Sequence, residues 1–195
     1  MMRTSALSLG LLMLAGSTAF GATWTIDSAH SGANFSVRHM MVSNVRGSFS
    51  KVTGTVDYDP STPAGSKADV TIDVTTINTN EPKRDEHLKS PDFFEVAKFP
   101  TMRFVSKRVV PAGPGKLKLL GDLTIHGVTK EVTFDVDAPA AEVKEQRGGA
   151  RSGASATAKI SRKDFGLTWN RAIEAGGVAV SDEVAITLDI ELTRK

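Results

Sequence analysis

The side chains that most often perform acid–base or metal chemistry are thinly spread along this chain. Its histidines, at positions 30, 39, 87 and 126, lie far apart, and no two have the spacing of a His-x-x-x-His metal motif. Asp85, Glu86 and His87 are adjacent, but adjacent residues on a helix point in different directions. The chain has no cysteine, which excludes disulfides, thiolate metal ligands and thiol catalysis.

Other motifs of catalysis and of nucleic-acid binding are also missing. Ser31 and Ser90 lie in no Gly-x-Ser-x-Gly nucleophile elbow, and no glycine-rich phosphate loop precedes a helix. The formal net charge is +2 and no block of basic residues occurs, so nothing favours nucleic acid as a partner. We therefore expect no enzyme, no catalytic residue, and no metal or other cofactor.

The N-terminal segment is typical of a secretory signal peptide. Met1-Met2-Arg3 supplies a positive charge, residues 6–15 are apolar, and small residues follow at 16–22. The apolar run is shorter than the roughly 20 residues that span a bilayer, so we expect no membrane-spanning segment. We predict that residues 1–21 are removed after Gly21 and that residues 22–195 form one domain, which is exported to the periplasm.

The remaining chain is dominated by apolar and polar residues that alternate with period two. This pattern predicts strands with one buried and one wet face, as in antiparallel sheets. The runs occupy residues 33–38, 52–58, 70–75, 102–107, 117–125, 128–136, 154–161 and 184–192, with a shorter one at 24–26. Turn residues separate them, so we predict an all-β sandwich or barrel; a barrel would also remove exposed sheet edges.

Two segments depart from this alternation. Residues 81–89 are polar and helix-like, with Asn80 as the expected cap and Pro82 in the first turn. On the residues alone, this helix is a solvated surface helix. The aromatic residues Phe93, Phe94 and Phe99 follow it, and a second irregular stretch carries Phe165 and Trp169. These side chains either plug one end of a barrel or line the entrance to a cavity.

The inward-facing side chains leave two interpretations open. An eight-stranded barrel either fills with side chains or holds one small ligand. Small inward residues at Gly54, Gly121, Ala154, Ala156 and Ala158 favour some empty space, but large residues opposite them would fill it. His39 has the parity of Phe35 and Val37, so its ring either meets a polar ligand group or completes a turn.

Four blocks of sequence, in order, resemble the YceI-like family. The first runs from Asp27 to His39, with residues 45–49 after it, and the second covers residues 84–94 with Phe99-Pro100-Thr101. The third covers residues 121–130, and the last residues 162–170, followed by Gly176-Gly177 and residues 182–184. The resemblance spans about residues 24–193 and includes no catalytic motif.

The resemblance implies a lipocalin-like, eight-stranded antiparallel barrel in the periplasm. It also implies an apolar tunnel that binds a polyisoprenoid, a polyprenyl phosphate or an isoprenoid quinone. It places His39, residues 84–87 and Asn170 as candidates for contact with the lipid head group. Taking the inward face, the aromatic segments and the resemblance together, we expect ligand contacts from Phe35, Val37, His39, Phe49, Ile72, Arg84, His87, Phe93, Phe94, Phe104, Phe134, Phe165, Trp169 and Asn170.

We therefore predict a carrier or sequestering protein for an isoprenoid lipid. A lipid-modifying hydrolase is the first alternative; it needs His39 and His87 to converge with an acidic residue at the mouth of the cavity. A ligand-free interaction module of the cell envelope, with a solid barrel core, is the second. The sequence leaves open whether two copies form a homodimer.

Overall fold

The computed structural model describes residues 22–146, 148–173 and 176–195. The expected signal peptide, residues 1–21, lies outside the described residues. Strands make up most of the described chain, with one α-helix and short 3₁₀ turns. The elements are β1 (Ala22–Ile26), β2 (Gly32–His39), β3 (Ser43–Phe49), β4 (Val52–Tyr58), β5 (Lys67–Asp73), β6 (Ile77–Asn78), α1 (Pro82–Lys89), β7 (Thr101–Pro111), β8 (Lys116–Ile125), β9 (Val128–Asp137), β10 (Val143–Lys144), β11 (Ala150–Ser161) and β12 (Val180–Arg194).

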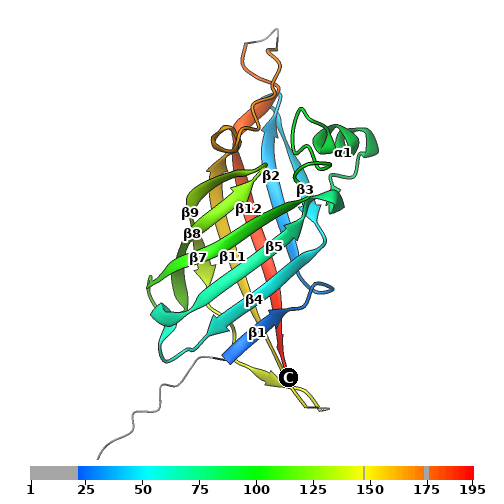
Figure 1. Cartoon of the computed structure of the whole chain (residues 1–195). Coiled ribbons are helices and arrows are strands. Elements are labelled where there is room, and N and C mark those ends of the chain that lie inside the picture. Colours follow the sequence, from blue (N-terminus) through cyan, green and yellow to red (C-terminus); the bar gives the residue numbers. More distant parts are fainter. Residues whose placement is uncertain (1–21, 147, 174–175) are drawn as a thin grey trace, which may run out of the picture.

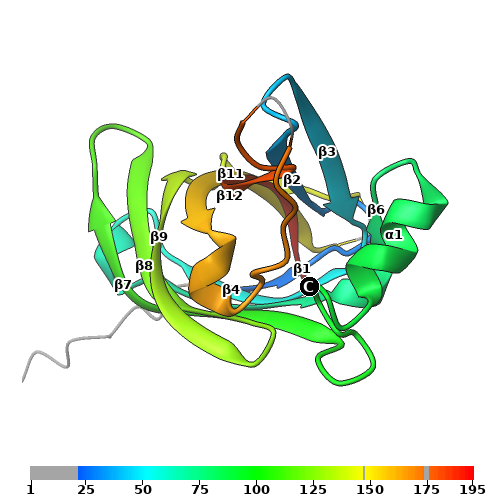
Figure 2. The same ribbon diagram turned by 90° about the horizontal axis from the view of Figure 1, so that it is seen from above.

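Eight of these strands close into an antiparallel barrel, which confirms the predicted fold class. The ring runs β11-β9-β8-β7-β5-β4-β1-β12 and is closed by a long β11–β12 ladder. Figure 1 shows the tilted strands around the barrel, and Figure 2 shows the ring from above. Alternate residues of each strand face inward, so the apolar parity of the sequence becomes the inner wall of the barrel.

β12 is long enough to pair with two strands along one edge. β1 pairs with its C-terminal end, at Leu192 and Thr193, and β2 pairs with the stretch from Val180 to Asp189. β3 and then β6 continue the sheet beyond β2. At this end of the barrel α1 contacts β6, so the helix lies beside the β2–β3 hairpin (Figure 2).

The predicted strands are mostly correct, with three local corrections. β3 was not predicted as a strand, because Gly47 and the polar residues around it interrupt the alternation. The strand expected at 70–75 ends at Asp73, whose carboxylate accepts hydrogen bonds from Thr75 N (3.0 Å) and Oγ1 (2.6 Å) and so begins a 3₁₀ turn. In β7 a register shift between Ser106 and Arg108 reverses the parity, so Val109 is buried.

The predicted helix at 81–89 is confirmed as α1, but its cap is different. Glu81, not Asn80, is the N-cap residue, and its carboxylate accepts a hydrogen bond from Lys83 N at 3.2 Å. Asn80 instead has a φ of 62°, which turns the chain into the helix. Pro82 occupies the first turn as expected. No helix in the described part of the chain is both long and apolar enough to cross a membrane.

Candidate functional site

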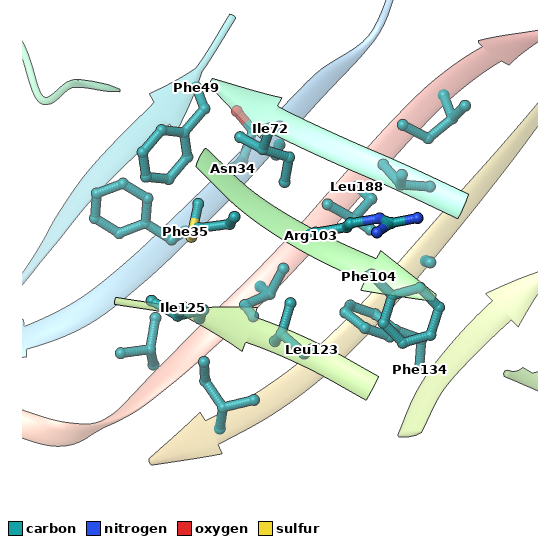
Figure 3. Close-up of a pocket in the computed structure, with 18 of the residues that line it drawn as sticks. Asn34, Phe35, Phe49, Ile72, Arg103, Phe104, Leu123, Ile125, Phe134 and Leu188 are labelled. Atoms are coloured by element: carbon teal, nitrogen blue, oxygen red, sulfur yellow. The ribbon is translucent and has the colours of Figure 1, made fainter. Parts of the chain in front are cut away.

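A cavity of about 400 Å³ lies inside the barrel. This volume lies within the range of roughly 300–1,000 Å³ that is usual for small-molecule sites. Its wall is almost entirely apolar and is built from the inward residues of the barrel strands, together with β2 and β3. Figure 3 shows side chains from several strands converging on this space. The interpretation with a solid, fully packed core is therefore wrong.

The inner wall carries large and small residues on facing strands. The Phe104 and Phe134 rings meet edge to face, with centroids 5.2 Å apart, and Leu123 lies beside them (Figure 3). Ala154 and Ala156 of β11 line the cavity from another side, where their methyl groups leave room. Facing residues of unequal size thus leave an open space whose wall is mostly apolar.

Two glycines that were expected to leave empty space in the cavity instead allow close contacts between neighbouring strands. A Cβ at Gly121 would lie 2.6 Å from Phe104 Cζ and 2.4 Å from Val105 O. A Cβ at Gly54 would lie 2.1 Å from Asp69 O, and its φ of 141° strongly favours glycine. These positions let the neighbouring strand or ring approach closely, so they tighten the barrel instead of opening it.

Aromatic side chains close the end of the barrel beside α1. The Phe49 ring contacts Phe35 at 5.6 Å and Phe94 at 5.9 Å between centroids. Phe93 packs against Trp169 at 5.2 Å. All five line the cavity, so these aromatic side chains both plug this end of the barrel and contribute to the cavity wall.

One face of α1 borders the cavity. Arg84, His87 and Leu88 follow the three- and four-residue spacing of a single helix face, and all three line the cavity. The His87 ring meets Trp169 edge to face at 5.0 Å, and its Nε2 lies 2.8 Å from Asp92 Oδ2. The solvated-surface interpretation of residues 81–89 is therefore incomplete, because it describes only the other face of the helix.

Arg84 brings a positive charge to the part of the cavity wall that α1 borders. Its Nε donates to Thr79 Oγ1 and its Nη2 donates to the carbonyl oxygen of Thr79, each at 2.8 Å. Thr79 is buried, and its backbone N–H and hydroxyl both donate to Asp85 Oδ1, at 2.9 and 2.5 Å. Within the described residues no carboxylate lies within ion-pair distance of Arg84. The hydrogen bonds to Thr79 thus hold the guanidinium in place at the cavity wall.

Arg162 was overlooked as a functional residue, yet it organises the segment that carries Phe165 and Trp169. Its side chain is 4% exposed and donates to the carbonyl oxygens of Leu167, Trp169 (2.9 Å) and Ser181 (2.9 Å). Burial lowers the pKa of this guanidinium, and the charge of Asp182 opposes that shift. The parity of Ala156, Ala158 and Ile160 continues to position 162, which is the signal that could have placed Arg162 inside.

The structure brings most of the predicted contact residues together. Those that line the cavity are Phe35, Val37, His39, Phe49, Ile72, Arg84, His87, Phe93, Phe94, Phe104, Phe134, Phe165 and Trp169. Asn170 is not part of the lining. Its amide donates to Val180 O (2.7 Å) and accepts from Val180 N (3.1 Å), so it ties the loop before β12 to that strand. Phe99 packs on His126, and Ala158 also lies outside the lining.

A second polar cluster lies where β1 leaves the barrel, at the other end of β12. Asp27, His30 and Glu191 place their ligand atoms within 4.8 Å of one another, a contact that sequence spacing did not reveal. Arg151 donates to Asp27 Oδ2 at 2.8 Å and also to Glu191. Hydrogen bonds from His30 and Arg151 lower the pKa of Asp27, and the Asp27 carboxylate raises the pKa of His30. We assign this cluster as an ion-pair network.

Comparison with known proteins agrees with this architecture. The UPF0312 protein SAS2572 of Staphylococcus aureus (strain MSSA476) is 38% identical over 170 residues, covering 87% of this chain and 96% of that protein. The crystal structure of Burkholderia cenocepacia BcnA superposes with a TM-score of 0.74 at 27% identity, over 85% of this chain and 98% of that one. A polyisoprenoid binding domain from Saccharophagus degradans shares the fold, with a TM-score of 0.65 at 16% identity, over 88% and 98% of the two chains.

The family model described as YceI-like domain covers nearly all of the described chain. It matches residues 24–192, from within β1 to within β12. This range contains the barrel, α1 and every residue that lines the cavity. The chain therefore belongs to the YceI-like domain family.

Proposed function

We propose that this protein binds an isoprenoid lipid in its barrel cavity and carries it through the periplasm. The observation that supports the proposal most directly is the mostly apolar cavity, whose lining also includes Arg84 and His87 of α1. The Saccharophagus degradans domain that shares the fold is named a polyisoprenoid binding domain, and a polyisoprenoid chain is an apolar ligand suited to such a cavity. The predicted signal peptide supports the periplasmic location.

The apolar wall supplies the affinity for the lipid tail. Each CH₂ group that leaves water contributes about 0.8 kcal/mol, so a few isoprenoid units can be held without polar contacts. The wall carries large rings at the Phe104–Phe134 pair and only methyl groups at the alanines of β11. This uneven wall suits the methyl branches of an isoprenoid tail. The tail then lies along the barrel between β11 and β7.

The head group of the lipid lies at the entrance beside α1. Arg84 offers charge and hydrogen bonds there, and His87 and His39 add further polar groups to the lining. A phosphate or a quinone carbonyl can accept these hydrogen bonds. Because no described carboxylate forms a direct ion pair with Arg84, a phosphate gains more from its charge than a neutral head group does.

The hydrolase alternative gains no support from this geometry. It required His39 and His87 to converge with an acidic residue. His87 pairs with Asp92 across 2.8 Å, but His39 lies on β2, opposite Ser43 and Val180. A binding function without catalysis stays our prediction, and incubation of the protein with a polyprenyl phosphate would test it through the appearance of products.

The proposal is tested with protein purified from the periplasmic fraction without detergent. Organic extraction followed by mass spectrometry should recover one isoprenoid lipid per chain. Protein that carries no lipid, and that takes up none when it is offered, would contradict the proposal. For the carrier role, the protein should also speed the transfer of a labelled polyprenyl phosphate from donor to acceptor vesicles.

The head-group assignment is tested with a matched pair of charge changes on α1. Arg84→Gln should weaken binding of a polyprenyl phosphate by about ten- to a hundredfold, since a hydrogen bond to a charged group contributes roughly 1.5–3 kcal/mol. Binding of the neutral polyprenol should change little. Lys83→Gln removes the same charge from an exposed position of the same helix and should affect neither ligand. Equal losses for both ligands would contradict the assignment.

A further inference from the structure

The β2–β3 hairpin ends in a turn that holds apolar side chains in solvent. Val42 N donates to His39 O at 3.0 Å, and the two residues between them, Met40 and Met41, have φ values of 50° and 60°. Turns with two positive φ values normally contain asparagine and glycine. Met41 is nevertheless 52% exposed and Val42 is 76% exposed. An unfavourable backbone conformation thus presents two large apolar side chains to the surroundings.

A second loop lies against this turn and adds to the same surface. Met40 N donates to Ala179 O at 2.8 Å, and a Cβ at Gly177 would lie 3.4 Å from Met41 Cγ. Val178, in this loop, is 37% exposed. We call Met41, Val42 and Val178 the apolar tip. Figure 1 shows that the β2–β3 turn and the loop before β12 lie together at the same end of the molecule.

The apolar tip lies next to the wall of the cavity. Val37 and Val45 face each other on β2 and β3 and line the cavity, as does Val180 at the start of β12. The His39–Ser43 pair lies between these valines and the turn, and His39 also lines the cavity. The exposed end of the hairpin is therefore close in sequence and register to the ligand cavity.

Basic residues surround the apolar tip. Arg38 and Arg46 share the outward parity of the β2–β3 ladder, and Arg171 is exposed at the base of the second loop. Arg38 Nη2 donates to Met41 O at 3.1 Å, which keeps its charge beside the turn. In the described parts of the chain, none of these arginines is in an ion pair. Residues 38–46 contain no acidic residue; Glu174 lies outside the described residues.

We propose that the apolar tip docks on an anionic lipid bilayer, so that the lipid ligand passes between membrane and cavity. Three exposed apolar side chains are far fewer than a stable protein interface needs, since such interfaces bury at least about 1,000 Å². Docking on a bilayer needs less apolar area, because shallow insertion of a few apolar side chains combines with the attraction of arginines to anionic head groups. This inference rests on the proposed binding of a membrane lipid.

The test measures whether the protein floats with lipid vesicles in a density gradient. The protein is used in the form that the cell exports, and intact-mass spectrometry defines its N-terminus. The protein should float with phosphatidylcholine vesicles that contain phosphatidylglycerol and much less with phosphatidylcholine alone. M41S/V42S should lower the bound fraction about tenfold, since the affinity of an interfacial segment scales with the apolar area that it buries. Arg38→Gln with Arg46→Gln should remove the preference for phosphatidylglycerol.

Val143→Ser is the matched control. Val143 is 66% exposed on β10, which pairs with the start of β11 beside Arg194, at the end of β12 opposite the tip. Flotation of M41S/V42S equal to that of the unmodified protein, or an equal loss in Val143→Ser, would overturn the proposal. So would a dimer in light scattering that M41S/V42S converts to a monomer, because the tip would then be a protein interface.

The docking proposal and the proposed function fail in different measurements. Lipid extraction from the same samples reports on binding in the cavity, and flotation reports on the tip. Protein that carries an isoprenoid but does not float overturns docking alone. Protein that floats through its tip but never holds a lipid overturns the proposed function and leaves the docking surface established.

Discussion

Filling the cavity with a side chain should abolish lipid binding without unfolding the barrel. Ala156 of β11 is suited to this change, because it lines the cavity and lies opposite Leu188 of β12 and Val136 of β9. In Ala156→Phe an aromatic ring replaces a hydrogen of the methyl group and enters the empty space. The substitution leaves the ladder hydrogen bonds of β11 in place, since it changes no backbone group.

The size of the effect follows from the cavity volume. An apolar cavity that accommodates a benzene ring has a volume of roughly 150 Å³, which is more than a third of the volume of about 400 Å³ in this barrel. The added ring displaces at least one isoprenoid unit of five carbons. At about 0.8 kcal/mol per carbon, the loss is about 4 kcal/mol, or roughly a thousandfold in Kd.

Two measurements separate loss of space from loss of fold. Binding of a polyprenyl phosphate gives the change in Kd, and thermal unfolding gives the change in stability. Thr157→Phe is the matched control, because it adds the same ring to the exposed outer face of the same strand and should leave Kd unchanged. An unchanged Tm in Ala156→Phe is expected if the ring enters empty space.

A different outcome would refute the reasoning. If the interior were already filled, the added ring would cost roughly 1–3 kcal/mol of stability through overpacking. Tm would then fall by several degrees, at about 2–4 °C per kcal/mol in a domain of this size. Unchanged lipid affinity in Ala156→Phe would show that the ligand does not occupy the space beside β11.

Three further changes test the architecture around the cavity. Arg162→Met should lower the free energy of unfolding by about 2–4 kcal/mol in denaturant titrations, because several buried carbonyl oxygens lose their donor; Arg162→Lys should recover part of it. The raised pKa of His30 adds stability that is fully present below pH 6.5 and is lost as the pH rises through the raised pKa, so the free energy of unfolding should decline across that pH interval. Asp27→Asn should flatten this decline. M40N/M41G should raise the free energy of unfolding by about 1–2 kcal/mol, because both positions have the left-handed backbone conformation that asparagine and glycine tolerate best. The same change should weaken vesicle flotation.

The strands could be predicted from sequence because a period-two pattern reports burial directly. Where a local interaction competes with the pattern, the prediction was wrong. Asp73 caps a 3₁₀ turn and ends β5 early, and the shift after Ser106 changes which residues of β7 face inward. Gly47 hides β3, because a residue without a side chain carries no parity; the Phe35 ring occupies its place.

The inward residues of the cavity were also predictable, but its polar entrance was predictable only through family resemblance. Arg84 and His87 face the cavity because α1 packs beside β6, and no pattern within residues 81–89 specifies that contact. Asn170 lies outside the cavity lining, and its amide completes a backbone pairing with Val180 that its sequence position does not indicate. The roles of glycines at tight contacts likewise depend on neighbours far away in the sequence.

The most direct test of the central claim is a crystal structure of protein purified without detergent. We predict continuous, branched electron density inside the barrel, running past Phe104 and Phe134 and ending in a head group beside Arg84. An interior that is empty or holds only separate water molecules, in crystals of protein offered a polyprenyl phosphate, would contradict the account.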